Sequence, residues 1–158
     1  MNFDTGRFIL KIAETSEELH AAQRLRYKVF VEEMGANVAD DCHASRMEYD
    51  KFDQDFDHLI LIDSLNRNTA ENVVGVYRLM LNTSVSKNRG FYSSSEYNLD
   101  KLIKADRKIL ELGRSCIDKQ HRGGVALHMM WNGLAQYVID NNVEVLFGVA
   151  SFHGVDIN

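Results

Sequence analysis

Two opposite charges, Glu111 and Arg114, stand inside the apolar run Leu110–Ile117 (LELGRSCI). Charged side chains are rarely buried unless they are paired, so a core strand that carries both signs indicates polar contacts inside the fold. Possible partners are the acidic segment Glu48–Asp53 and Arg78, which lies in a second apolar run. The three charged groups therefore predict one polar site inside an apolar fold.

The acidic segment has more than one possible use. Glu48, Asp50 and Asp53 could act as bases, as ligands or simply as solvated surface charge. The aspartates from Asp53 onward resemble the start of a calcium loop, but its glycine and closing glutamate are missing, which excludes that site. Arg26, on a predicted helix, could bind these acids as a bidentate clamp.

The spacing of Glu111 and Arg114 raises a geometric problem. Residues three apart on a regular strand point to opposite faces. One extra residue at Leu112–Gly113, a β-bulge, would bring both side chains to the same face. Bulges are common near active sites and Gly113 suits one, so we expect a bulge there. The alternative is an ordinary strand near a sheet edge with solvated charges.

A glycine-containing turn, Lys119–Gly124 (KQHRGG), stands between a predicted strand and a predicted helix. Free N–H groups and the helix dipole make such a turn suitable for anions. One interpretation is a cradle for the phosphates of a nucleotide or of a pantetheine carrier. The other is a plain strand-to-helix turn with basic side chains in solvent, and one glycine pair does not decide between them.

Hydrophobic periodicity predicts the elements that position these groups. A capping box within Thr15–Glu18, with Thr15 or Ser16 as the cap, starts a helix that ends at Gly35. Residues 36–57 are predicted to form a long loop. We expect strands at 7–12, 58–62, 73–81, 109–117 and 143–150, and further helices at 99–103 and 125–139. This order predicts a mixed α/β (α+β) fold around one sheet.

Composition narrows the class of protein. The 158 residues allow one domain with its own core, and a net charge of −5 argues against nucleic-acid binding. The two cysteines, Cys42 and Cys116, make no disulfide framework, and no cysteine–histidine spacing suggests a metal site. We expect a reducing cytoplasm, with neither a signal peptide nor a membrane span.

Taken together, these motifs resemble the GNAT-type N-acyltransferases, in particular the acyl-carrier-protein-dependent ornithine N-acyltransferases, often labelled haemolysin-like. The resemblance covers nearly the whole chain. The segments that carry it are Arg26–Phe30, Glu48–Asp53, Val74–Leu79, Phe91–Ser93, Glu111–Cys116 and Leu146–Phe152. Acyl-homoserine lactone synthases are similar over much of this pattern. They usually carry a tryptophan soon after the first segment, which is missing here, and Gly113–Cys116 is more similar to the ornithine enzymes.

The resemblance implies a GNAT-like, mostly antiparallel sheet flanked by helices. It also implies transfer of a fatty acyl group, with or without a 3-hydroxyl, from acyl carrier protein to the α-amine of ornithine, the first step of ornithine-lipid synthesis. The carrier's phosphopantetheine thioester is then the co-substrate, and no cofactor or metal is required. Alternatives are an acyl-homoserine lactone synthase, which acylates S-adenosylmethionine, and an inactive fragment of an acyltransferase.

The resemblance also implies residue roles. Glu48 is the candidate base, with Glu111 as the alternative. Backbone N–H groups freed by the bulge would stabilise the oxyanion. The implied substrate-binding residues are Arg26, Asp50, Asp53, Arg78, Arg114 and Ser115. The implied carrier- and phosphopantetheine-binding residues are Cys116, Gln120, Arg122, Gly123 and Gly124. Basic patches at 101–108 and 119–122 would meet the acidic carrier, and peripheral membrane contact is possible.

Two departures from the family pattern qualify this expectation. The phosphate turn matches only in part, which suits a carrier protein better than tightly bound coenzyme A. Relatives also continue beyond the strand at 143–150, so we expect the single domain, residues 1–158, to be C-terminally truncated. This strand is apolar on both faces and should be internal. An uncovered edge there would make the 158-residue form self-associating and weakly active.

Overall fold

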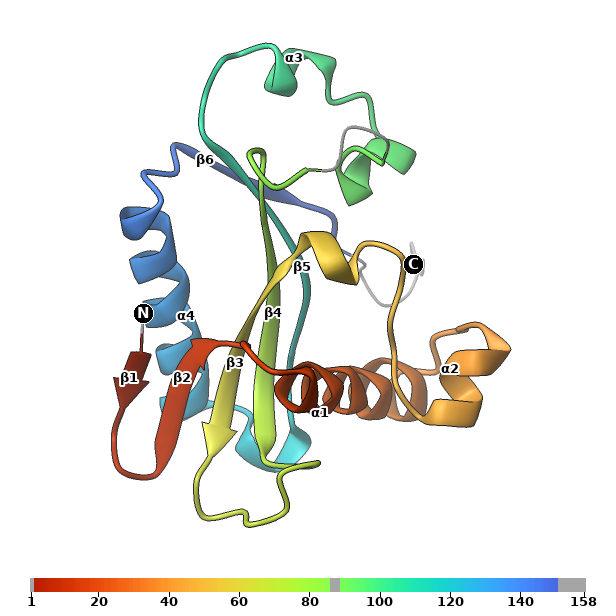
Figure 1. Ribbon diagram of the computed structural model, residues 1–158, viewed down its shortest axis with the longest axis vertical. Coiled ribbons are helices and arrows are strands. Elements are labelled where there is room, and N and C mark those ends of the chain that lie inside the picture. The colour runs from red at the N-terminus through yellow and green to blue at the C-terminus, as the bar shows by residue number, and fades with distance from the viewer. Residues whose placement is uncertain (1, 86–88, 151–158) are drawn as a thin grey trace, which may run out of the picture.

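The computed structural model describes residues 2–85 and 89–150 and shows a central sheet with helices on both faces (Figure 1). Within these residues the sheet has six strands in the order in which they occur along the chain. All neighbouring strands are antiparallel except the last pair, which is parallel. The strands are β1 (Asn2–Asp4), β2 (Phe8–Ile12), β3 (Asp57–Asp63), β4 (Val73–Leu81), β5 (Ile109–Ile117) and β6 (Val145–Gly148).

Helices connect and cover these strands. Helix α1 (Ser16–Arg26) continues directly into a π-helix, Tyr27–Glu33, a rare form that is frequent at functional sites. The other helices are α2 (Asp40–Ser45), α3 (Asp100–Ile103) and α4 (Gly124–Asp140). Single 3₁₀ turns occur at Asp53–Asp55, Tyr92–Ser95 and Lys119–His121.

The alternation of side chains along the central strands creates two apolar layers. Leu59 and Leu61 of β3 pack with α4, whereas Ile60 between them packs with α1. Because successive residues of a strand face opposite sides, α1 and α4 cover opposite faces of the sheet. Strands β3 and β4 are therefore apolar on both faces, as the sequence predicted for the second of them.

Most of the predicted elements are confirmed. Thr15 caps α1 in a capping box with Glu18, and the predicted mixed α/β fold is present. Three predictions were incomplete or wrong. Strand β1 was not predicted, and the expected loop at 36–57 contains α2. Strand β6 is the edge of the described sheet, with Leu146 45% exposed, so its two faces are not both buried within the described residues.

The predicted bulge in β5 is present, but at Arg114–Ser115, two residues further along the strand than Leu112–Gly113. Between the pairs Val76–Cys116 and Arg78–Gly113, β5 contributes two residues and β4 only one. Within this bulge Arg114, with φ of 52°, adopts the left-handed conformation. A non-glycine residue in this conformation is uncommon and is often found where the surrounding contacts hold it.

Gly133 of α4 allows the helix to lie close to the sheet. A Cβ atom there would lie 2.4 Å from Leu10 Cδ2 and 3.3 Å from Leu59 Cδ1, both in the buried core. In an open helix the change from glycine to alanine would stabilise by up to about 1 kcal/mol. At this position the close approach of α4 to β2 and β3 reverses that preference.

We predict that Gly133→Ala lowers the free energy of unfolding by about 1–3 kcal/mol, because overpacking a dense core costs that much. Urea denaturation followed by circular dichroism measures the change. The matched control is Asn132→Ala on the exposed face of α4, which should leave stability unchanged or raise it by a few tenths of a kcal/mol. A Gly133→Ala protein as stable as the control would contradict the packing argument.

Candidate active site

Six charged side chains from four parts of the chain meet on the α1 side of the sheet. They come from α1, from the segment between α2 and β3, from β4 and from the bulge of β5 (Figure 1). We refer to them as the charged cluster. Its members are Arg26, Glu48, Asp50, Asp53, Arg78 and Arg114.

Arg26 lies at the centre of the charged cluster and is fully buried. Its Nε donates to Glu48 Oε2 at 2.6 Å, and its Nη2 donates to both carboxylate oxygens of Asp53 and to the Glu48 carbonyl. The predicted bidentate clamp on the acids is therefore confirmed. Because α1 is bound in this way to the segment before β3, the acidic loop has a fixed position above the sheet.

Arg78 is also buried and binds two of the acids, as its mid-strand position predicted. Its Nη1 donates to Asp53 Oδ1 at 2.6 Å and to Asp50 Oδ1 at 2.9 Å. Its guanidinium lies 4.5 Å from the centre of the Phe56 ring. The charged cluster contains three arginines and three carboxylates, so its formal charges balance, which is what allows so many charges to be buried together.

Asp53 is buried and is the acid that binds both Arg26 and Arg78. Burial by itself raises the pKa of Asp53, but Arg26 and Arg78 outweigh burial and hold its pKa at about 2. Gln23 Nε2 donates a further hydrogen bond to it at 2.9 Å. Gln23 was not singled out in the sequence, although a polar residue three positions before Arg26 on a buried helix face was an available signal.

Glu48 connects the buried part of the charged cluster to its open part. One oxygen accepts from Arg26, and the other accepts from Arg114 Nε at 2.9 Å. The Arg114 side chain is 28% exposed, and its Nη2 lies 3.7 Å from Asp50. Burial lowers the pKa of Arg114, but Glu48 more than offsets this, so the pKa of Arg114 is raised. Arg114 is therefore a permanent cation with further N–H donors.

Two cavities meet at Glu48 and Arg114, which line both of them. The larger cavity, of about 810 Å³, has an apolar wall that includes Val29, Phe30 and Met34 from the π-helix and its end. The smaller cavity, of about 450 Å³, has more charged residues among those that line it, including Asp41, Asp50 and Lys51. The arrangement can hold an apolar group and a polar, charged group side by side, with a carboxylate and a guanidinium between them.

Glu111, the alternative base, is placed differently. It is 1% exposed and lines neither of these cavities. Its carboxylate accepts hydrogen bonds from the backbone of Tyr92 and Ser93. Arg114 lies 5.2 Å from the centre of the ring of the same Tyr92. Because both side chains reach Tyr92, the bulge does bring Glu111 and Arg114 to the same side of the sheet. The two side chains meet through Tyr92 rather than directly.

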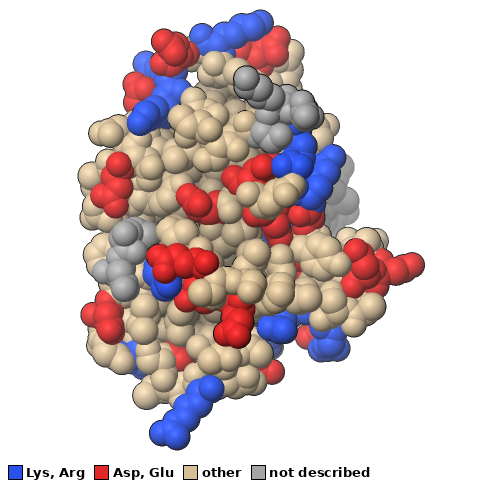
Figure 2. Space-filling view, in the orientation of Figure 1, with Lys and Arg blue, Asp and Glu red and all other residues tan. Residues whose placement is uncertain are grey.

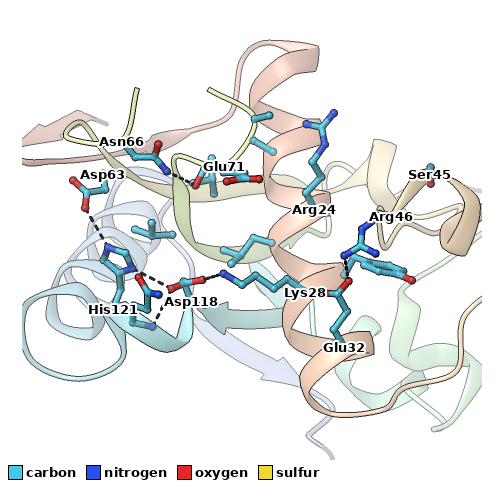
Figure 3. A pocket seen from close by; sticks show the side chains of 17 residues that line it. Arg24, Lys28, Glu32, Ser45, Arg46, Asp63, Asn66, Glu71, Asp118 and His121 are labelled. Carbon is cyan, nitrogen blue, oxygen red and sulfur yellow. Dashed lines mark hydrogen bonds and ion pairs between the residues drawn. The ribbon is translucent and has the colours of Figure 1, made fainter. Parts of the chain in front are cut away.

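The residues expected to bind the carrier do not form one group. Cys116 and Arg122 line the larger cavity, whereas Gln120 lines a third cavity of about 590 Å³ (Figure 3). Burial raises the pKa of the Cys116 thiol to about 12, which favours the protonated thiol over the nucleophilic thiolate at neutral pH. Gly123 and Gly124, both with positive φ, stand at the start of α4. Ser115 is exposed and lines the larger cavity.

The third cavity contains a hydrogen-bonded chain that the sequence did not indicate. Figure 3 shows His121 between Asp63 and Asp118, with Lys28 bound to Asp118. Arg7 holds the pKa of Asp63 at about 2, and the pKa of Asp118 is also lowered because Lys28 outweighs its burial. Since Asp63 and His121 are 58 residues apart, no local pattern could reveal this contact.

The basic patch expected around α3 lies at the end of the molecule away from α1. In Figure 2 blue and red side chains are interleaved there, and Lys104 pairs with Asp100 at 3.3 Å. Within residues 2–85 and 89–150 no group of three or more histidines, cysteines, aspartates or glutamates is arranged to hold a metal ion. No helix in this part of the chain is long and apolar enough to cross a membrane. Ser151 and Phe152 lie outside the described residues.

The chain belongs to the GNAT acetyltransferase family, because residues 25–132 match the family model described as an acetyltransferase (GNAT) domain. Among curated proteins, an L-ornithine N(alpha)-acyltransferase of Rhodobacter capsulatus is 46% identical over 149 residues, which are 94% of this chain and 58% of the relative. The chain spans about half the length of the curated relatives it matches.

Two solved structures are similar in fold. The acyl-homoserine lactone synthase LasI has a TM-score of 0.63 at 21% identity, over 92% of this chain and 74% of that one. FeeM, an N-acyl amino acid synthase from uncultured soil microbes, has a TM-score of 0.64 at 15% identity, over 90% of this chain and 70% of that one. These likenesses confirm the GNAT-like fold that the sequence predicted.

The lowered pKa of Asp53 predicts a loss of stability in acid. The group has a pKa of about 2 in the folded state and 3.8 as the ordinary value, so its contribution is complete above pH 4 and is lost as the pH falls towards 2. A shift of this size corresponds to about 2 kcal/mol. Urea denaturation between pH 5 and 2 measures it.

The control for this prediction is Asp63→Asn, since Asp63 is the other aspartate with a pKa of about 2 and lies outside the charged cluster. In that variant the free energy of unfolding should still fall as the pH is lowered from 4 to 2, by the amount that Asp53 contributes. A free energy of unfolding that stays constant between pH 4 and 2 in Asp63→Asn would contradict the prediction.

Proposed function

We propose that this protein transfers a fatty acyl group from an acyl carrier protein thioester to the α-amine of L-ornithine, the first step of ornithine-lipid synthesis. The observation that carries the proposal is that Glu48 and Arg114 line two adjoining cavities, one with the apolar side chains of the π-helix in its wall and one with further charged side chains, Asp50 and Lys51. The similarity to the Rhodobacter capsulatus L-ornithine N(alpha)-acyltransferase supports the choice of substrate.

In this proposal the larger cavity takes the acyl group and its pantetheine arm, and the smaller cavity takes the amino acid. The apolar side chains of the π-helix match the acyl chain, and Cys116 and Arg122 line the same space. Arg114 has N–H donors beyond the one given to Glu48, and a guanidinium suits the α-carboxylate of the amino acid. The two substrates then meet where the cavities join.

The reaction requires an unprotonated amine. Glu48 accepts a proton from the ammonium, and the amine nitrogen bonds to the thioester carbonyl carbon. The carbon–sulfur bond then breaks, and the second proton lost by the nitrogen passes to the departing sulfur, which leaves the amide and the pantetheine thiol. Glu48 is preferred to Glu111 as the base because it lines both cavities and Glu111 lines neither. The bulge at Arg114–Ser115 interrupts the ladder, and backbone N–H groups freed there would suit the oxyanion.

The remaining candidate residues either hold the charged side chains of the site in position or would contact the carrier. Arg26, Asp53 and Arg78 are buried and hold Glu48 and Asp50 in position. The turn that carries Gln120, Gly123 and Gly124 would receive the pantetheine arm, and the basic patch at 101–108, at the other end of β5, would be a separate contact with the carrier. A carrier-protein co-substrate places the reaction in the cytoplasm, and the acylated product would be delivered at the membrane surface.

The fold likeness to LasI keeps a second candidate function open, acylation of S-adenosylmethionine followed by lactone formation. Mass spectrometry of the products separates the two candidates. The purified protein should convert acyl-carrier thioester and ornithine to N-acyl-ornithine. An N-acyl-homoserine lactone from S-adenosylmethionine would favour the second candidate, and no product from either amine would indicate an inactive fragment.

We predict that Glu48→Gln lowers kcat by at least about 100-fold, since a general base contributes that much or more. The variant keeps the size of the side chain and one acceptor oxygen, but its NH₂ group faces one of the two arginine donors. Thermal unfolding should therefore show a lower stability, and kcat is measured at a temperature where circular dichroism shows the variant still folded. Glu17→Gln, on the exposed face of α1, is the matched control and should keep full activity. Near-normal turnover of Glu48→Gln would remove Glu48 from the role of base.

We predict that Lys104→Glu with Arg107→Glu raises the KM for the carrier protein about tenfold at low salt, with little change in kcat, because surface charges act mainly on the encounter. The effect should shrink as salt is added. Arg67→Glu at the β3–β4 turn reverses a charge elsewhere on the surface and serves as control. An equal effect of both changes would locate the carrier elsewhere.

A further inference from the structure

Glu111 is a buried carboxylate that takes no part in the ion pairs of the charged cluster. It is 1% exposed, and within residues 2–85 and 89–150 no lysine, arginine or histidine forms an ion pair with it. Burying a carboxylate without a cation is costly unless several hydrogen bonds stabilise its charge. The partners of Glu111 therefore indicate what its charge is used for.

These partners are all at the start of one 3₁₀ turn, Tyr92–Ser95. Glu111 Oε2 accepts the Tyr92 N–H at 2.8 Å, and Oε1 accepts the Ser93 N–H at 2.7 Å and the Ser93 hydroxyl at 2.5 Å. The first N–H groups of a helical turn have no partner within the turn. Phe91, which precedes the turn, makes no side-chain capping bond. Glu111 of β5 supplies the missing cap from another strand.

The capped turn holds the Tyr92 ring against the charged cluster. The ring centre lies 5.2 Å from the Arg114 guanidinium carbon and 5.8 Å from that of Arg78. The ring also packs against Phe52 in an edge-to-face arrangement, with 5.5 Å between the ring centres. Cation–π contacts gain strength where water is excluded, so the position of Tyr92 restricts where the Arg114 guanidinium can lie.

We propose that Glu111 is a positioning residue: by capping the Tyr92–Ser95 turn it fixes Tyr92 over Arg114 and so sets the guanidinium that binds the amino-acid carboxylate. The capping of the turn does not depend on which reaction the protein catalyses. Only the binding of an amino-acid carboxylate by Arg114 rests on the proposed function. A glutamine would present an NH₂ group to one of the two backbone donors, and an aspartate is one methylene too short to reach them from the same backbone. The site therefore requires a glutamate for reasons of geometry.

The first test measures the cap without any assay of activity. In Glu111→Gln the Tyr92 and Ser93 amides should exchange with deuterium at least about tenfold faster, because a hydrogen bond to a charged acceptor is lost. Nuclear magnetic resonance measures these rates amide by amide. Ser93→Ala, which removes one of the three donors and keeps the carboxylate, should speed exchange at the turn by a smaller factor and remains informative if Glu111→Gln fails to fold.

The second test separates positioning from catalysis. A positioning role predicts that Glu111→Gln raises the KM for ornithine at least about tenfold, while kcat changes less and the pH profile of kcat/KM keeps its shape. Tyr92→Leu keeps the cap and removes the ring, so it should reproduce the KM defect while the Ser93 amide stays protected. Loss of kcat with the low-pH limb of the profile would make Glu111 the base and overturn the proposal.

The outcomes distinguish the two proposals. Unchanged exchange of the Tyr92 and Ser93 amides in both Glu111→Gln and Ser93→Ala overturns the capping role, whatever the activity. If amide exchange is faster in the variants but the wild-type protein forms no N-acyl-ornithine, the capping role stands and the proposed function is rejected. Faster exchange with an unchanged KM for ornithine removes the link from Tyr92 to Arg114.

Discussion

The guanidinium of Arg26 is fully buried, and its bonds to Glu48 and Asp53 attach the segment before β3 to α1. The rest of the charged cluster depends on this attachment, because Asp53 also binds Arg78, and Glu48 also binds Arg114. Removal of Arg26, Asp53 or Arg78, the most deeply buried members that bind one another, would leave an uncompensated charge in the protein interior. The six side chains are consequently held as one unit.

The solvent exposure of the charged cluster increases from Arg26 and Arg78 towards Arg114. Arg26 and Arg78 are buried, whereas Arg114 is partly exposed and lines two cavities. The bulge in β5 produces this gradation, since it turns Arg114 towards Glu48 and interrupts the pairing with β4. The buried members give rigidity, and the open end at Glu48 and Arg114 is where a substrate can be bound in a defined geometry.

Local patterns predicted most of the fold. The capping box at Thr15, the two-sided apolar strands and the glycine turn before α4 were each visible within a few residues. The prediction failed where the local signal was weak: α2 is short and polar, and β1 has only three residues. The bulge was predicted from the spacing of Glu111 and Arg114, but glycine propensity pointed to Gly113, whereas contacts with Glu48 and Tyr92 hold Arg114 in the left-handed conformation.

The sequence by itself determined the class of fold, the family and the set of charged residues that form the cluster, because helix caps, strand alternation and short motifs are local properties. Only the tertiary structure decided which charges pair and what each one does. Glu48 meets Arg26 across 22 residues and Arg114 across 66. Glu111 turned out to hold a backbone turn and not an arginine. Which charges pair depends on how segments far apart in the sequence lie relative to one another. These relative positions exist only once the sheet and α1 have packed.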